Sequence, residues 1–134
     1  MSKILNIVIM ALLFSSTAWA NEDGKQGVYF VMPSNASTHQ GEVHLVMAVN
    51  GMAVQKAGVL KEGTGHFHVI VDGGFVAKGS PVAKNATHIH FGKGQVEAKL
   101  ELPDGEHTLT LQFADGHHIS YGAAWSQTVR VNIK

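Results

Sequence analysis

Two closely spaced histidine pairs are the residues of this chain best suited to chemistry. One residue separates His66 from His68 and His88 from His90, and a Gly-rich connector joins the two pairs. Side chains two residues apart on a β-strand point to the same side of a sheet. If each pair lies on a strand, its two imidazoles can therefore reach one ion. Neutral imidazole is a good ligand for copper, zinc and nickel.

Three further residues could contribute ligands to such a site. His117 and His118 are adjacent in the sequence, and because adjacent strand residues point to opposite sides, we expect at most one of them to join. Met52, beside a predicted turn, could offer a thioether to Cu(I). The alternative is a polar sheet face on which the histidines bond to one another or to loop backbone.

Alternating hydrophobic residues predict how the two pairs are held. Phe67, Val69, Ile89 and Phe91 occupy the positions between and after the histidines, and this period of two predicts strands whose apolar faces are buried. The histidines should then face outward or toward a covering loop. The connector, residues 72–87, is longer than a usual hairpin turn and could cover or open that face.

The rest of the chain predicts an all-β fold. Residues 33–41 are predicted to form a polar turn, and residues 52–63 a loop with a short strand. Seven short strands, separated by turn signals and without a convincing helix, favour a single antiparallel β-sandwich of immunoglobulin-like size, with a small barrel as the alternative. The predicted strands cover residues 27–32, 42–50, 66–72, 88–91, 95–102, 108–114 and 127–134.

The first twenty residues predict a secretory signal peptide. Lys3 precedes an apolar run over residues 4–14, and Ala18-Trp19-Ala20 is a small-residue end that predicts cleavage after Ala20. The apolar run is too short to span a bilayer as a helix. We therefore expect residues 21–134 to form one periplasmic or secreted domain without membrane insertion.

Composition limits the classes of site that the domain can carry. The sequence has no cysteine and nine histidines, which excludes thiolate ligands and disulfides. Removing Lys3 with the signal peptide leaves 9 basic and 10 acidic residues, and no basic stripe predicts nucleic-acid binding. No phosphate-binding loop or nucleophile elbow is present. Catalysis is left uncertain, with the balance against an enzyme, because a catalytic metal would also need an open position.

Two stretches resemble a family of exported bacterial domains. Residues 63–72 read GTGHFHVIVD and are similar to that family's GTGHHHLLID signature, while residues 88–109 resemble its second block, HIHFGKGQVEAKLELPDGEHTL. The family is domain of unknown function 4399, so the resemblance implies an exported β-domain and indicates no particular activity. Phe67 replaces the middle histidine of the signature, and Asp115-Gly116-His117-His118 stands where relatives have a longer loop.

These observations lead to two hypotheses about function. The first is a periplasmic metal-binding protein that uses a histidine cluster as a carrier, buffer or sensor, with copper favoured over zinc because the ligands are imidazoles in an oxidising compartment. The second is a non-catalytic structural or interaction module of the cell envelope, with the histidines in hydrogen-bonding roles. The sequence identifies no protein partner.

Overall fold

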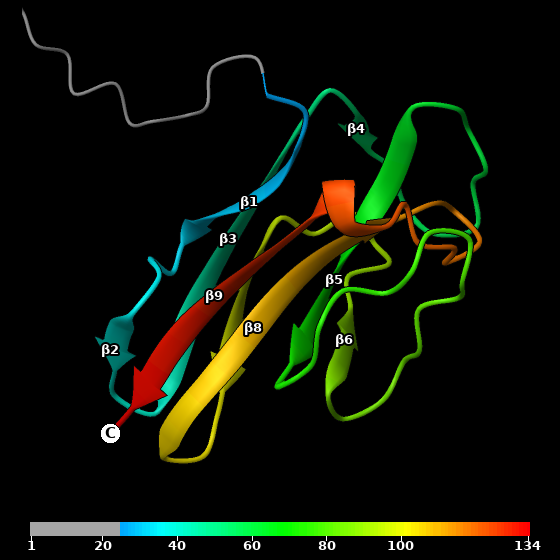
Figure 1. Ribbon diagram of the computed structural model, residues 1–134. Coiled ribbons are helices and arrows are strands. Elements are labelled where there is room, and N and C mark those ends of the chain that lie inside the picture. Colours follow the sequence, from blue (N-terminus) through cyan, green and yellow to red (C-terminus); the bar gives the residue numbers. More distant parts are fainter. Residues whose placement is uncertain (1–24) are drawn as a thin grey trace, which may run out of the picture.

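The computed structural model describes residues 25–134 as two β-sheets that pack on one another (Figure 1). The predicted signal peptide, residues 1–20, lies outside the described residues. The smaller sheet has three strands in the order β1, β3, β7, joined by antiparallel ladders. Its strands are β1 (Gly27–Met32), β3 (Glu42–Asn50) and β7 (Glu97–Glu101).

The larger sheet has six strands and carries the histidine pairs. Its order is β2, β9, β8, β5, β4, and β6 also pairs with β5. Its strands are β2 (Ser37–His39), β4 (Ala53–Val54), β5 (Thr64–Val71), β6 (His88–His90), β8 (Gly105–Ala114) and β9 (Ser126–Ile133). A short 3-10 helix, η1 (Ala123–Trp125), precedes β9.

The prediction of an all-β sandwich is confirmed, with nine strands in the described residues instead of about seven. All seven predicted strands are present, and β4 is the short strand expected within residues 52–63. The addition is β2, which lies in the segment predicted as a polar turn. Strands β2 and β4 pair in parallel, β2 with β9 and β4 with β5, whereas the other ladders of the described residues are antiparallel as predicted.

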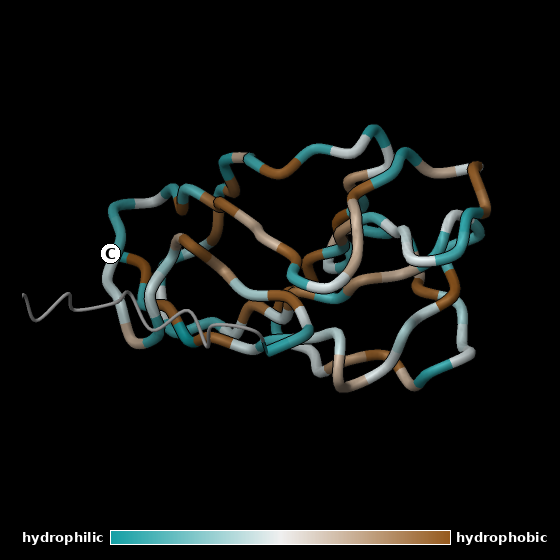
Figure 2. The backbone as a smooth tube through the Cα atoms, turned by 90° about the horizontal axis from the view of Figure 1, so that it is seen from above, coloured by the Kyte–Doolittle hydropathy of each residue, from teal (hydrophilic) through white to brown (hydrophobic). Residues whose placement is uncertain are grey.

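The core lies between the two sheets and is built from the apolar faces that the alternation predicts. Phe67 and Val69 of β5 are fully buried there, as are Leu109 and Leu111 of β8. The rings of Phe67 and Phe113 pack with their centroids 5.1 Å apart. Hydrophobic and hydrophilic segments alternate along the chain (Figure 2). Among the described residues, no helix is long and apolar enough to cross a membrane.

Strand β5 is buried on both of its faces, as is the C-terminal half of its neighbour β8. Seven of the eight residues of β5 are buried, so the strand does not alternate between core and solvent. One face meets the core, and the other lies beneath the segments 73–87 and 115–122. Of the two orientations that the sequence left open for His66 and His68, outward or toward a covering loop, the structure shows the second.

Candidate metal centre

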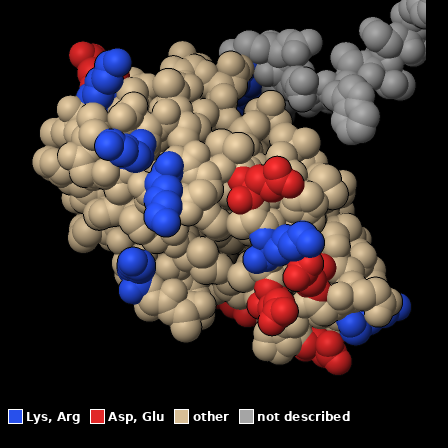
Figure 3. Space-filling model, turned by 180° about the vertical axis from the view of Figure 1, so that it is seen from behind, with Lys and Arg blue, Asp and Glu red and all other residues tan. Residues whose placement is uncertain are grey.

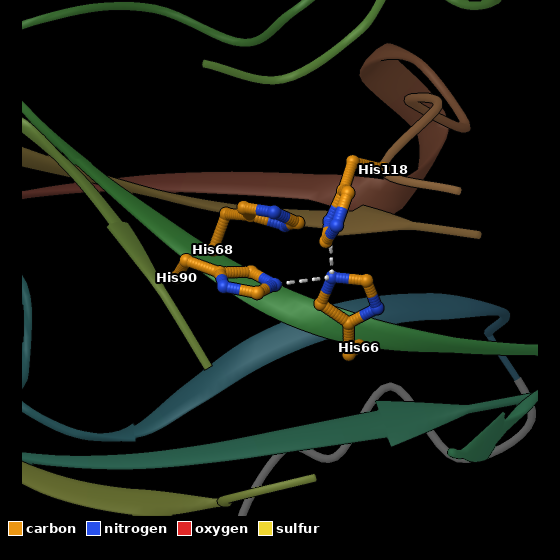
Figure 4. Close-up of side chains that lie close together, drawn as sticks. All are labelled: His66, His68, His90 and His118. Atoms are coloured by element: carbon orange, nitrogen blue, oxygen red, sulfur yellow. Dashed lines mark hydrogen bonds between the residues drawn. The ribbon is translucent and has the colours of Figure 1, made fainter. Parts of the chain in front are cut away.

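Four histidine side chains converge on the covered face of the larger sheet (Figure 4). One ring nitrogen from each of them can be chosen so that all four atoms lie within 4.8 Å of one another. The ring centroids are 4.5 to 5.9 Å apart. The group consists of His66, His68, His90 and His118.

The antiparallel ladder between β5 and β6 positions three of these rings. His68 lies directly opposite His90, and His66 is two residues before His68 on the same side of β5. Gly92 leaves room for the third ring, because a Cβ atom there would lie 2.3 Å from Cε1 of His90. Any larger residue at this position would displace the His90 ring.

A tight turn after β8 supplies the fourth ring. The Asp115 carboxylate accepts hydrogen bonds from the backbone N–H groups of His117 and Ile119, at 2.8 and 3.0 Å. Within this turn His118 adopts a positive φ of 64°. A Cβ atom on Gly116 would lie 2.0 Å from the carbonyl oxygen of Val59, so the turn packs against the loop after β4 only with glycine there.

The two covering segments are hydrogen-bonded to each other above the site. The Val82 N–H donates to the His118 carbonyl at 2.8 Å, and the Ser120 N–H donates to the Ser80 carbonyl at 2.9 Å. Gln112, buried on β8, joins both segments to the sheet: its Oε1 accepts from the Val76 N–H at 2.9 Å and its Nε2 donates to the Gly122 carbonyl at 3.1 Å. The two covering segments are therefore held in place over the site by hydrogen bonds to each other and to the sheet.

Burial and mutual proximity favour the neutral forms of His66, His68 and His90. Burial, helped by the nearby rings of His90 and His118, lowers the pKa of His66 from 6.5 to about 4. Burial followed by the charges of the other rings lowers the pKa of His68 to about 3. The pKa of His90 is also lowered, mainly by burial. Neutral imidazole is the form that binds metals.

The distances between ring nitrogens suit a metal ion better than a network of protons. His66 Nε2 lies 3.0 Å from His118 Nδ1 and 3.1 Å from His90 Nε2. A neutral ring nitrogen either donates one proton or accepts one bond in its plane, so protons satisfy only one of these contacts well. Tetrahedral ligands at about 2.0 to 2.1 Å from zinc would have nitrogens about 3.3 Å apart.

Two buried ring nitrogens have no hydrogen-bond partner among the described residues. They are Nδ1 of His66 and Nδ1 of His68, on side chains that are 0% and 1% exposed. Buried polar atoms are nearly always hydrogen-bonded. In His66 this atom is not the nitrogen that faces His90 and His118, so it lacks a partner with or without a bound metal ion and does not distinguish the two alternatives.

The structure brings together three of the four histidines that spacing predicts as ligands, and it places His88 at the edge of the site. His88 is the first residue of β6, two residues before His90, and lies opposite Ile70. Its Nδ1 lies 3.0 Å from Thr87 Oγ1 and 3.1 Å from Asn85 Oδ1. The geometric group includes His118 in its place.

The remaining predicted candidates lie outside this group. Of the adjacent pair, His118 points into the site and His117 is exposed. Met52 is half-buried and packs against the hydrophobic core. Sequence reasoning could name the pair 117–118 as a source of one ligand, but choosing between them required the turn geometry.

The comparisons with known proteins identify the family. The model of a family described as "Domain of unknown function (DUF4399)" matches residues 45–134. The chain belongs to this family. All four histidines of the site lie within the part of this DUF4399 chain that the family model matches.

The other comparisons do not indicate a function for this DUF4399 protein. No curated protein matches its sequence significantly. Its fold is similar to part of an endo-beta-1,4-mannanase from Thermotoga petrophila, with a TM-score of 0.48 and 14% sequence identity. The match covers 81% of this chain and spans only 20% of the mannanase chain.

Proposed function

We propose that this domain binds one copper ion, or less favourably one zinc ion, through His66, His68, His90 and His118. The observation that carries the proposal is the convergence of four imidazoles, two of them fully buried, with potential ligand atoms within 4.8 Å of one another. Four neutral nitrogen ligands without a thiolate suit copper(II) and zinc. The Irving–Williams order places copper(II) above zinc for such a donor set.

The proposed role is that of a periplasmic carrier, buffer or sensor of copper. It rests on the predicted signal peptide, with cleavage after Ala20, and on the cysteine-free composition. Three of the ligands come from paired strands and the fourth from a hydrogen-bonded turn, so the donors are held in place before the metal arrives. Such preorganisation favours specific metal binding.

The test is metal uptake by purified protein comprising residues 21–134. We expect one equivalent of copper per chain by elemental analysis and calorimetry, together with a rise in melting temperature. A ligand present at 100 times its dissociation constant stabilises the folded state by about 2.7 kcal/mol. Uptake of neither copper nor zinc at micromolar concentration would refute the proposal.

Paired variants separate metal binding from a structural role. The double variant His66→Ala, His68→Ala should lose the metal-induced rise in melting temperature, whatever its stability without metal. The matched control is His44→Ala, because His44 lies on the smaller sheet and pairs with Glu97. If the double variant keeps the full metal-induced rise, the histidines have only the hydrogen-bonding role of the alternative hypothesis.

A further inference from the structure

The proposed metal centre has no negatively charged ligand to balance the charge of the metal ion. All four donors are imidazoles, so a divalent ion bound there would keep its full charge of +2. The charge of Asp115 acts on His66, but one oxygen of this carboxylate is already bonded to two backbone N–H groups of the turn. A buried charge without a counter-charge is unfavourable.

The loops around the site add positive charge instead of balancing it. The segments 52–63, 73–87, 91–95 and 115–122 contain five lysines against two acidic residues, Glu62 and Asp115. The lysines are Lys56, Lys61, Lys78, Lys84 and Lys93, and all five are exposed. On the face drawn in Figure 3, basic side chains predominate toward one end of the molecule, and most acidic side chains lie toward the other end, together with further basic ones.

Hydrogen bonds hold these lysine-bearing loops against the site. The Ala57 N–H donates to the Gly92 carbonyl at 2.8 Å, and the Gly58 N–H donates to the Gly116 carbonyl at 2.8 Å. The loop after β4 therefore lies beside both the end of β6 and the turn that carries His118. The positive rim belongs to the same folded unit as the histidines.

One lysine lies near the half-buried rings of the cluster. His66 and His68 are fully buried, whereas His90 and His118 are half-buried. Lys84 stands between Val82, which is bonded to the His118 carbonyl, and Asn85, which is bonded to the His88 backbone. Its charge is near enough to act on the His90 ring. The segment around Lys84 thus borders the accessible edge of the rings.

We propose that the metal-loaded site takes a small monoanion with an oxygen or nitrogen donor as an additional ligand, between His90 and His118 and with Lys84 on its approach. This inference rests on the proposed metal binding. The anion would supply the counter-charge that the four imidazoles lack, and Lys84 would favour its approach and binding. A free dication would be repelled by the same rim, so the lysines are better matched to an anion than to the metal.

The test is a titration of copper-loaded protein with sodium azide in a chloride-free buffer. Visible absorption and electron paramagnetic resonance should show a saturable change at one azide per copper, and calorimetry should show no azide binding to the metal-free protein. Lys84→Ala should raise the dissociation constant for azide about three- to tenfold, as expected for removing one nearby charge. Its affinity for copper should not fall.

The matched control is Lys99→Ala on β7, because Lys99 is also exposed but lies on the smaller sheet near Glu42. This variant should bind azide like the parent protein. Copper uptake with no spectral response up to high millimolar azide would overturn the anion site and leave the metal site standing. Equal azide affinities of the two lysine variants would overturn the role of Lys84, and failure to bind copper or zinc would overturn both proposals.

Discussion

The two ends of β5 place histidine in opposite environments. Near its start, His66 and His68 are buried among other imidazoles, and their pKa values are lowered. Just after its end, Asp72 accepts a hydrogen bond from His107 Nδ1 at 2.8 Å, while His107 Nε2 donates to the Pro103 carbonyl at 2.8 Å. Hydrogen bonding to Asp72 and then to Pro103 raises the pKa of His107.

The difference shows that the neighbours of a histidine decide which form of the ring the fold supports. Two acceptors at His107 require a proton on each ring nitrogen, which is the imidazolium form. Around His66 and His68 the neighbours are other rings, so a proton on one repels a proton on the next. Only the environment of His66 and His68 on β5 presents unprotonated nitrogens to a metal ion, whereas His107 lies on the neighbouring strand β8.

Acidification should produce the largest contrast between the two regions. Because the folded state holds the pKa of His66 at about 4 and that of His68 at about 3, the unfolded chain binds more protons below pH 6.5. The free energy of unfolding of metal-free protein should therefore fall as the pH drops below 6.5, by roughly 4 kcal/mol in total at pH 5. Urea unfolding at pH 7 and pH 5 measures this loss.

The double variant His66→Ala, His68→Ala serves as the control for that measurement. It lacks the two groups responsible and should lose much less stability between pH 7 and pH 5. The contribution of His107 has the opposite sign, because a raised pKa makes its protonated form more stable in the folded state. A parent protein that is equally stable at both pH values would contradict the assignment of the cluster as neutral and buried.

The next prediction distinguishes His118 from His88 as the fourth ligand. His118→Ala should weaken copper binding at least tenfold, because it removes one of four convergent donors. His88→Ala should change the affinity by less than about threefold, since His88 is bonded to Asn85 and Thr87 at the edge of the site. Competitive titration against a chelator of known affinity measures both values.

The electron paramagnetic resonance spectrum of bound copper(II) provides a second test of the variants His118→Ala and His88→Ala. With His118 replaced, the hyperfine pattern of copper(II) should change from four nitrogen donors to three, whereas the His88→Ala spectrum should match the parent. The exposed neighbour His117 offers a further control, because His117→Ala leaves the His118 ring in place. A larger loss of affinity in His88→Ala than in His118→Ala would reverse the assignment.

Much of the fold follows from local pattern, because alternation reports which face of a strand is buried. Phe67 and Val69 are predicted and found in the core. The pattern cannot report the second burial of β5, because that depends on the distant segments 73–87 and 115–122 folding back over the strand. Strand β2 was missed for a related reason: its pairing with β9 is long-range, and its polar residues look like a turn.

The site was predictable as far as strand geometry reaches. Strand residues that are two apart point to the same face, and this rule correctly brings His66, His68 and His90 together. The same rule also predicted His88 as a ligand, which the structure places outside the group. Register decides between the members of the second pair: His90 lies opposite His68, whereas His88 lies opposite Ile70. His118 depends on the turn anchored by Asp115, and its positive φ is a tertiary feature. No spacing rule could choose it over His117.

The smallest expected effect concerns the other end of β5. Asp72→Asn keeps an oxygen that can accept from the Thr108 N–H but removes the charge facing His107. It should lower the free energy of unfolding by about 1 kcal/mol or less at pH 6, because half of the Asp72 side chain is exposed. The loss should be smaller at pH 9. Because the pKa of His107 is raised in the folded state, the ion pair stabilises the fold fully below the unfolded pKa of 6.5, and this stabilisation is lost as the pH rises through the pKa of the folded state. Urea unfolding at both pH values tests this, with copper affinity expected to stay unchanged. A loss of equal size at pH 6 and pH 9, or a weakened copper site, would show that the two ends of the strand are not independent.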